Sequence, residues 1–145
     1  MAWRPTDQII RDRVQKYVYP GETLYVQGFG AQQPSFGWIL AFGTLATFFF
    51  KYYALGIKET GLIVTELSIW NYKEKAASIV PWNSIFNVTY NPGTFQDILC
   101  FQTGDGRQWK LRFQKVWGLT QNREAGKSLA QYIYSWSQAV QQQGQ

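Results

Sequence analysis

The sequence contains no histidine and a single cysteine, Cys100, in 145 residues. Without histidine it lacks the commonest general base and metal ligand, and every Ser-His or Cys-His mechanism is excluded. One cysteine excludes an internal disulfide and a cysteine-rich zinc site. We therefore expect this chain to have no enzyme activity, no metal and no other cofactor.

Charged residues are also scarce, at 16% of the sequence, against roughly 25% in an average soluble protein. Aromatic residues reach 18% and include seven tryptophans, so material for a core is plentiful. The shortage of charge indicates that part of the surface contacts something other than water. The net charge of +5 favours an acidic partner such as an anionic lipid surface, although this value is also ordinary for a soluble domain.

No catalytic or nucleotide-binding motif is present. The sequence has neither a P-loop nor a Gly-x-Gly-x-x-Gly loop. Asp97 and Asp105 flank one predicted hairpin at its start and its tip, so we expect them to lie too far apart to act together. Cys100 alternates with Ile98 in a predicted strand, which favours a small core residue over a nucleophile. We infer no small-molecule substrate.

Hydrophobic periodicity predicts a helix near each end of the chain and strands between them. Residues 6–18 form the first predicted helix. Residues 122–140 form the second, which has one long apolar stripe and Asn122 as its predicted N-cap. Short strands with closely spaced turns lie between them and predict an antiparallel sheet or small barrel. We expect one domain, residues 1–145, of the mainly β (α+β) class: about seven strands capped by the C-terminal amphipathic helix.

Turn residues divide the central region into strands. Residues 22–29 are the first predicted strand, and the loop 30–35 follows it. Glu59 and Thr60 make a short turn between the next two strands, and Gly-Asp-Gly at residues 104–106 turns the last hairpin.

The most unusual segment is an uncharged run, residues 36–50, which we call the apolar segment. Its large aromatic side chains are the predicted membrane- or partner-facing residues: Phe36, Trp38, Phe42, Phe48, Phe49 and Phe50. Trp38 near one end and Lys51 beyond the other are typical of anchors at a membrane interface. With its polar flanks, this insertion is expected to cover residues 30–51.

The apolar segment is too short to cross a bilayer as a helix, which needs about 20 apolar residues. One crossing would also separate the first strand from the others, and two crossings need about 40 residues. Three alternatives stay open: an element that dips into one leaflet, a surface covered by a protein partner or a second copy, and an internal part of the core. Helix and β-hairpin both stay open for its conformation.

Four basic residues are the predicted contacts to acidic lipid: Lys51, Arg107, Lys110 and Arg112. The last three lie in or beside the final predicted strand and could form a stripe with Lys115 for acidic headgroups. The alternative is an ordinary solvated strand face. Strand alternation places Trp109 and Phe113 on the face opposite Lys110 and Arg112. Aromatic stacking and phosphate contacts would then not share a surface, which argues against nucleic-acid binding.

Short motifs occur in a characteristic order along the chain. They are Pro-Gly-Glu at 20–22, Tyr-Ala-Leu-Gly-Ile at 53–57, Gly-Leu-Ile-Val-Thr at 61–65 and Ile-Val-Pro-Trp-Asn-Ser-Ile at 79–85, before a hairpin and a helix. This arrangement resembles the bacterial pleckstrin-homology-like (PH-like) domains over residues 20–140, apart from the apolar segment. The family's typical Thr-x-x-Arg between the second and third strands is Lys-Glu-Thr-Gly here, at residues 58–61.

The resemblance implies a strongly bent seven-stranded sheet plugged at one end by the C-terminal helix. It also implies a non-catalytic binding or assembly module, often at a membrane, and it transfers no ligand residues. Phosphoinositide-binding relatives carry a basic cluster around the loop between the first two strands. Here that loop begins with the uncharged residues 32–35, which argues against specific inositol-phosphate recognition.

The predicted location is cytoplasmic, because no secretory signal opens the chain. The apolar segment and the positive net charge further predict a peripheral position on the inner face of a membrane. The predicted partners are an anionic lipid surface, a protein or a second copy. The alternative function is a soluble scaffold that homo-oligomerises through its apolar segment.

Overall fold

The computed structural model describes residues 7–32, 51–68, 73–93, 96–114 and 122–143. The elements are α1 (Asp7–Gln15), β1 (Val26–Gln32), β2 (Lys51–Lys58), β3 (Gly61–Leu67), β4 (Glu74–Pro81), the 3-10 helix η2 (Trp82–Ser84), β5 (Ile85–Asn91), β6 (Gln96–Thr103), β7 (Gln108–Gln114) and α3 (Asn122–Gln143). Within these residues, seven strands form one antiparallel sheet in the order β4-β3-β2-β1-β7-β6-β5. The predicted mainly β class, with about seven strands and a C-terminal helix, is confirmed.

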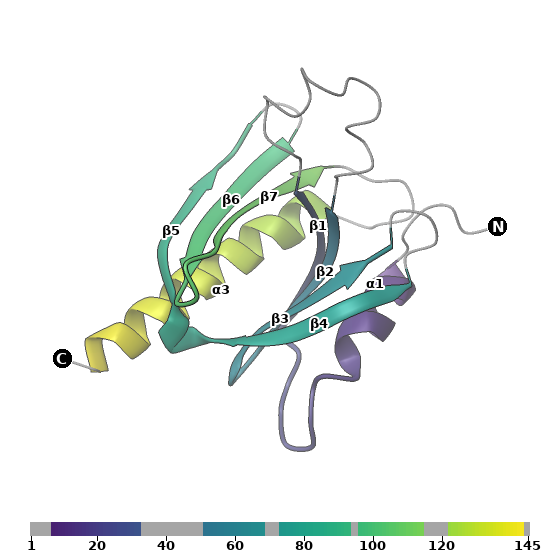
Figure 1. The fold of residues 1–145 in the computed structure, drawn as a ribbon, viewed down its shortest axis with the longest axis horizontal. Coiled ribbons are helices and arrows are strands. Elements are labelled where there is room, and N and C mark those ends of the chain that lie inside the picture. Colours follow the sequence, from purple (N-terminus) through teal and green to yellow (C-terminus); the bar gives the residue numbers. More distant parts are fainter. Residues whose placement is uncertain (1–6, 33–50, 69–72, 94–95, 115–121, 144–145) are drawn as a thin grey trace.

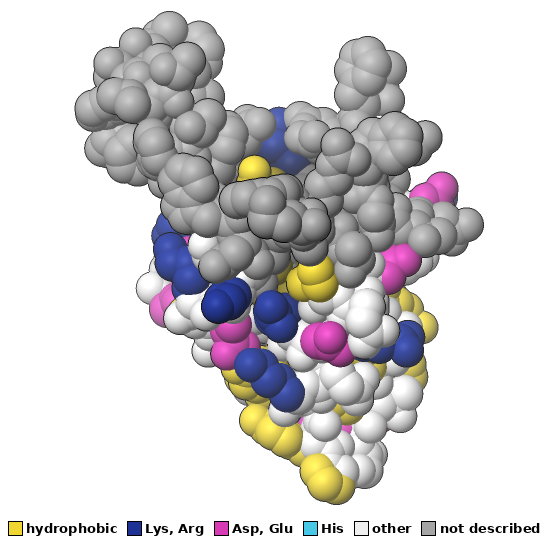
Figure 2. Space-filling model, turned by 90° about the vertical axis from the view of Figure 1, so that its right-hand side faces the viewer, with side chains coloured by type: hydrophobic (Ala, Val, Ile, Leu, Met, Phe, Trp, Pro, Cys, Tyr) yellow, Lys and Arg dark blue, Asp and Glu magenta, His cyan; other side chains and the backbone are white. Residues whose placement is uncertain are grey.

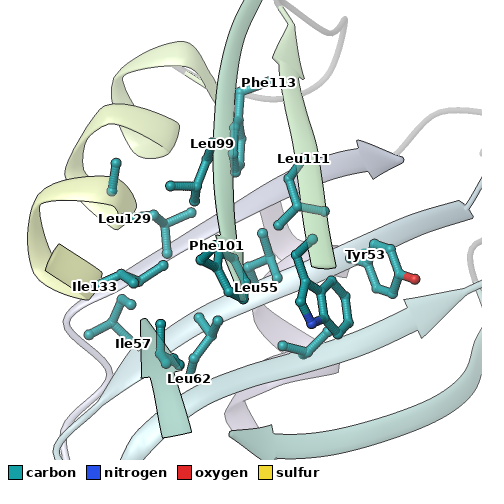
Figure 3. Packing of buried hydrophobic residues seen from close by; sticks show 14 of the residues in the cluster. Tyr53, Leu55, Ile57, Leu62, Leu99, Phe101, Leu111, Phe113, Leu129 and Ile133 are labelled. Atoms are coloured by element: carbon teal, nitrogen blue, oxygen red, sulfur yellow. The ribbon is translucent and has the colours of Figure 1, made fainter. Parts of the chain in front are cut away.

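The sheet is folded so that its β2–β4 half faces its β5–β7 half, and α3 lies along the β5–β7 half (Figure 1). The inner core fills the space between them. The strands contribute alternate side chains such as Leu55, Leu99 and Leu111, and α3 adds Leu129 and Ile133, all at most 1% exposed. Figure 3 shows these side chains converging from both halves of the sheet and from α3. Burial of this apolar surface is the main term that holds the helix on the sheet.

The first helix covers the outer face of β2 and β3. Ile10 and Val14 lie one helical turn apart and pack with Ala54, Ile63 and Leu67. β2 and β3 are therefore covered on both faces. This explains why their sequences are nearly continuous apolar runs rather than alternating ones.

The first strand begins later than predicted, at Val26 instead of residue 22. The preceding residues bond to the β2–β3 turn instead. The Glu22 carboxylate accepts a hydrogen bond from Lys58 Nζ at 2.9 Å, and the backbone N–H of Thr23 donates to the Glu59 carboxylate at 2.8 Å. Side-chain partners thus replace ladder partners at Glu22 and Thr23, and backbone bonding to β2 begins with the N–H of Tyr25, which donates to the Ile57 carbonyl at 2.9 Å.

The strand also continues further than predicted, because residues 30–32 are paired with β2. Gly30 was predicted to begin a loop, but the lack of a side chain there, as at Gly28 within the predicted strand, allows close packing. A Cβ at Gly28 would lie 2.7 Å from Leu129 Cδ1 of α3. The predicted insertion 30–51 is therefore too long, since residues 33–50 separate β1 from β2.

Both helices differ slightly in extent from their predictions. α1 ends at Gln15 rather than residue 18, because residues 16–18 form turns that lead into the contacts with the β2–β3 hairpin. Its predicted cap, Thr6, lies outside the described residues. α3 extends three residues beyond the predicted end, to Gln143.

β1 connects the two halves of the sheet. Among the described residues, it pairs with β7 through Ala31 and Arg112. Two residues earlier in β1, the side chain of Asn122 bonds to both backbone groups of Phe29: Nδ2 donates to the carbonyl oxygen and Oδ1 accepts from the N–H, each at 3.1 Å. Asn122 was predicted as an N-cap, but both polar atoms of its side chain bond to β1. Its amide serves as a strand partner where β1 and β7 separate.

Candidate functional site

A pocket of about 230 Å³ opens on the inner face of the sheet, and we call it the inner-face pocket. β2, β3 and β4 line one side, and the β6–β7 turn and the start of β7 line the other. Its polar and aromatic lining residues are Lys51, Tyr53, Glu66, Ser78, Arg107 and Trp109. Val64, Ala76 and Ala77 complete the lining.

Strand register brings the β2–β4 residues together. Tyr53 lies opposite Glu66 of β3, which lies opposite Ala76 of β4. Lys51 is two residues before Tyr53 and therefore on the same face of β2. Ser78 is two residues beyond Ala76 and therefore also on this face. One cross-strand row and its neighbours thus present an ammonium, a carboxylate and two hydroxyls to the pocket.

The β6–β7 turn positions Arg107 on the other side. Gly106 has a φ of 87°, a left-handed conformation that glycine adopts without strain. The Asp105 carboxylate accepts hydrogen bonds from Thr103 Oγ1 at 2.6 Å and from the backbone N–H of Arg107 at 3.0 Å. These two bonds hold the pKa of Asp105 below its ordinary value. The turn is therefore closed by its own side chains, and Arg107 leaves it in a defined direction.

The guanidinium of Arg107 is held by two aromatic residues. Its central carbon lies 3.7 Å from the centroid of the Trp109 ring, and Nη2 donates to the Tyr53 hydroxyl at 2.8 Å. Trp109 is itself fixed by edge contact with Tyr53 at 5.2 Å and by stacking on Phe101 at 5.8 Å. The cation therefore rests on a packed aromatic platform before any ligand arrives.

Tyr53 is the most buried polar residue of the pocket, at 2% exposure. Figure 3 shows it at the end of the core cluster away from α3. Burial raises the pKa of its phenol above the ordinary 10.0, the charge of Glu66 raises it further, and Arg107 opposes this shift. The phenol is thus protonated at neutral pH. Its oxygen accepts from Arg107, and the described residues provide no recorded acceptor for its own proton.

Lys51 and Glu66 form a loose pair at the mouth of the pocket. Lys51 Nζ lies 3.9 Å from Glu66 Oε1, which is beyond hydrogen-bond distance. The Lys51 side chain is 52% exposed and that of Glu66 is 21% exposed. An exposed ion pair of this kind contributes little to stability, so the two side chains can separate with a small change in free energy.

The four predicted basic residues do not form one surface. Lys51 and Arg107 line the inner-face pocket. Lys110 and Arg112 lie on the outer face of β7, because Trp109, Leu111 and Phe113 face the core, as predicted. Arg107 is therefore separated from Lys110 and Arg112, since the tight turn before β7 directs it inward onto Trp109, and Lys115 lies outside the described residues.

The six predicted aromatic contacts, Phe36, Trp38, Phe42, Phe48, Phe49 and Phe50, lie outside the described residues. The strands that flank them are described. Gln32 and Lys51 are register partners at the end of a seven-pair β1–β2 ladder. β1 and β2 must consequently lie on the same side of any membrane that the chain contacts, in agreement with the argument against a single crossing.

Asp97 and Cys100, the other two side chains considered for chemistry, lie away from this pocket. Asp97, at the start of β6, accepts hydrogen bonds from the Tyr90 hydroxyl and the backbone N–H of Gly93, far along the strand from Asp105. Cys100 was predicted to lie in the core, but it is half-buried on the outer face, opposite Lys110. In the described part of the chain, no group of three or more His, Cys, Asp or Glu residues could hold a metal.

Sequence reasoning missed Tyr53, Glu66 and Ser78 as pocket residues. Strand alternation put Lys51 and Tyr53 on one face, which was the available signal. Nothing local indicated that Arg107, more than fifty positions along the chain from Tyr53, would bond to it. The arrangement offers fixed hydrogen-bond donors and two cations, and it offers neither an activated nucleophile nor a base–nucleophile pair.

Comparison of the chain with protein families, curated proteins and solved structures found no match. Among the described residues, no helix is long and apolar enough to cross a membrane.

Proposed function

We propose that this chain is a non-catalytic PH-like binding and assembly module that acts peripherally on the cytoplasmic face of a membrane. It binds anionic lipid through the end of the sheet that carries the apolar segment. The strand order, the bent sheet and the closing helix α3 support the PH-like assignment, because they are the architecture that the sequence motifs imply.

The pairing of Gln32 with Lys51 is the observation that carries this proposal. The chain leaves the sheet at Gln32 and returns at Lys51, with an uncharged 36–50 between them. Six large aromatic side chains are therefore tethered at one point of one sheet end. Apolar burial combined with nearby positive charge is the usual basis of peripheral membrane binding.

Positive charge lies beside this point. Lys51 is exposed, and Arg112 of β7 pairs with Ala31, the neighbour of Gln32. Figure 2 shows further Lys and Arg side chains, with Asp and Glu side chains among them, on the face that lies on the right in Figure 1. Each cation near an anionic surface contributes about 1 kcal/mol to binding. The sheet end thus supplies both components of a membrane contact.

Vesicle flotation tests the electrostatic part. The full chain should float with phosphatidylcholine vesicles that contain phosphatidylserine, and more weakly with phosphatidylcholine alone. The double variant K51Q/R112Q should bind the anionic vesicles about 30-fold more weakly, from about 2 kcal/mol of lost attraction. R11Q/K127Q removes the same charge from exposed positions on α1 and α3, outside this end, and should have a smaller effect. Equal losses in the two double variants would contradict a defined binding end.

The replacement of Phe48, Phe49 and Phe50 by serine tests the apolar part. A folded variant that no longer floats supports the proposal, and Tyr134→Ser, an exposed aromatic on α3, is the matched control. A wild-type chain that stays monomeric and ignores anionic vesicles would refute the proposal. Self-association without lipid that is abolished by the serine substitutions would favour the homo-oligomeric scaffold instead.

A further inference from the structure

The inner-face pocket contains more hydrogen-bond donors than the protein itself uses. A guanidinium has five N–H groups, and the recorded side-chain bonds of Arg107 in the described residues use one of them, to Tyr53. The Tyr53 proton has no recorded acceptor there, and Tyr53 is 98% buried. Donors that are buried or fixed and left without acceptors favour a ligand that brings acceptors.

The charge of the pocket indicates the sign and size of that ligand's charge. Two cations, Lys51 and Arg107, face the same space, and Arg107 is held in place by Trp109. A carboxylate ligand carries one charge and two oxygens. A phosphate monoester carries a charge of about −1.5 to −2 at pH 7 and three strong acceptor oxygens. The charge of the phosphate monoester matches the two cations, and its additional oxygen can accept from the Tyr53 and Ser78 hydroxyls.

The volume of the pocket limits the ligand to a small group. About 230 Å³ is below the range of roughly 300–1,000 Å³ that is typical of sites enclosing a whole metabolite. A pocket of this size fits one anionic group and its immediate attachment, with the remainder of the ligand outside.

We propose that the inner-face pocket binds the phosphate of a phosphate monoester, with Arg107, Lys51, Tyr53 and Ser78 as its donors. The inference rests on the proposed function in one respect: at a membrane, a monoester lipid headgroup would be the natural source. A water-soluble phosphate monoester would present the same chemistry.

Glu66 disfavours phosphate binding, in contrast to the four donor residues of this pocket. Its carboxylate lies 3.9 Å from Lys51 Nζ, so it draws the ammonium toward itself and repels a phosphate. We therefore expect substitutions at two residues of the same pocket to change the affinity for phosphate in opposite directions. Removing Arg107 weakens phosphate binding, and removing the charge of Glu66 strengthens it.

The test is a titration of the ¹⁵N-labelled full chain with inorganic phosphate, followed by the amide signals of Ser78, Arg107 and Trp109. We expect saturable shifts in the wild type and at least about tenfold weaker binding in R107Q, because hydrogen bonds to a charged group are lost. E66Q should bind up to about fivefold more tightly. R11Q, the same substitution at an exposed position of α1 outside the pocket, should bind like the wild type.

Two further measurements exclude trivial explanations. If R107Q does not fold, Ser78→Glu replaces it, because residue 78 is exposed on the edge strand β4 and its substitution places a carboxylate at the pocket without removing a core contact. Binding should also strengthen between pH 5 and pH 7, as the phosphate loses its second proton near pH 6. Absence of saturable shifts, or equal affinity in wild type, R107Q and S78E, would overturn the inference.

Vesicles distinguish the two sources of the phosphate. Phosphatidic acid has a monoester headgroup, whereas phosphatidylserine is a diester. A preference of the wild type for phosphatidic acid vesicles over phosphatidylserine vesicles of equal surface charge, lost in S78E, would identify a lipid ligand. Phosphate binding without that preference would identify a soluble monoester. If the chain floats on phosphatidylserine vesicles but its amide signals do not shift with phosphate, this inference is overturned and the membrane proposal stands. If the chain binds phosphate but floats on no vesicle, the membrane proposal is overturned and this inference stands.

Discussion

The replacement of Asn122 by alanine should lower the free energy of unfolding by about 3 kcal/mol. Asn122 is 4% exposed and Phe29 is 6% exposed. The two hydrogen bonds between them, each 3.1 Å long, satisfy the N–H and the carbonyl of Phe29 on the side of β1 where β7 has moved away. Each buried group left without this partner costs about 1–3 kcal/mol. We use the lower half of this range for the N–H and for the carbonyl of Phe29, because the smaller alanine side chain lets water reach and partly satisfy these groups.

Urea denaturation of N122A measures this effect directly. The midpoint should fall while the slope stays the same, since the surface exposed on unfolding changes little. For a chain of 145 residues the unfolding entropy is about 0.3 kcal/mol/K, so the same change lowers the melting temperature by about 10 °C. Asn83→Ala, at an exposed position of η2, is the matched control and should change the free energy of unfolding by less than about 0.5 kcal/mol.

Asn122→Asp separates the strand-partner role from an N-cap role. Aspartate caps a helix as well as asparagine does, so a capping residue would tolerate this substitution. An ionised carboxylate cannot donate to the Phe29 carbonyl, and at this buried position it would face that oxygen with a charge. We therefore expect N122D to be at least as destabilised as N122A at neutral pH. An N122D variant as stable as the wild type would refute the strand-partner role.

Two further predictions concern stability. Hydrogen bonds from Lys58 and Thr60 lower the pKa of Glu22 to about 2, so the stability that Glu22 contributes is present above its ordinary 4.5 and is lost as the pH falls toward about 2. Lys58→Met should make the fall in stability over that pH range shallower in acid titrations, and an unchanged slope would count against the pair. A Cβ at Gly61 would lie 2.5 Å from the Val80 carbonyl oxygen, so Gly61→Ala should cost about 1–3 kcal/mol in urea denaturation. Gly104→Ala has room and should be nearly neutral, and similar losses in both would show that steric contact is not the cause.

The features that the sequence predicted well depend on local chemistry. The apolar stripe of α3, which includes Leu129 and Ile133, faces the core because residues four apart lie on one side of a helix. A short turn was predicted at Glu59 and Thr60. In the structure Lys58 pairs with Gly61, and Glu59 and Thr60 form the turn between β2 and β3. Such patterns need only neighbouring residues to be recognised.

The first strand shows where local reading failed. From their neighbours alone, residues 30–32 were placed in a loop and residues 22–25 in a strand. The pairing of residues 30–32 with β2 and the bonds of Glu22 and Thr23 to the β2–β3 hairpin reversed both assignments. These partners are remote in the chain, and no periodicity reports them.

The candidate site depends even more on remote contacts. The sequence identified Lys51 and Arg107 as basic residues of interest, but it did not connect Lys51 with Tyr53, two residues along the same strand. The fold of the sheet then brought the β6–β7 turn over β2, so that Arg107 joined Lys51 on the inner face while Lys110 and Arg112 remained outside.

The amino-acid sequence by itself therefore determined the elements of this protein, its mainly β class, its lack of histidine chemistry and the position of its apolar segment along the chain. These properties follow from composition, from periods of two and of about 3.6 residues, and from turn chemistry. Tertiary structure alone decided which faces of the strands are covered, which partner Asn122 has and which charges share a pocket. The physical reason is that burial and hydrogen bonding between distant residues are settled only when the two halves of the sheet pack against each other.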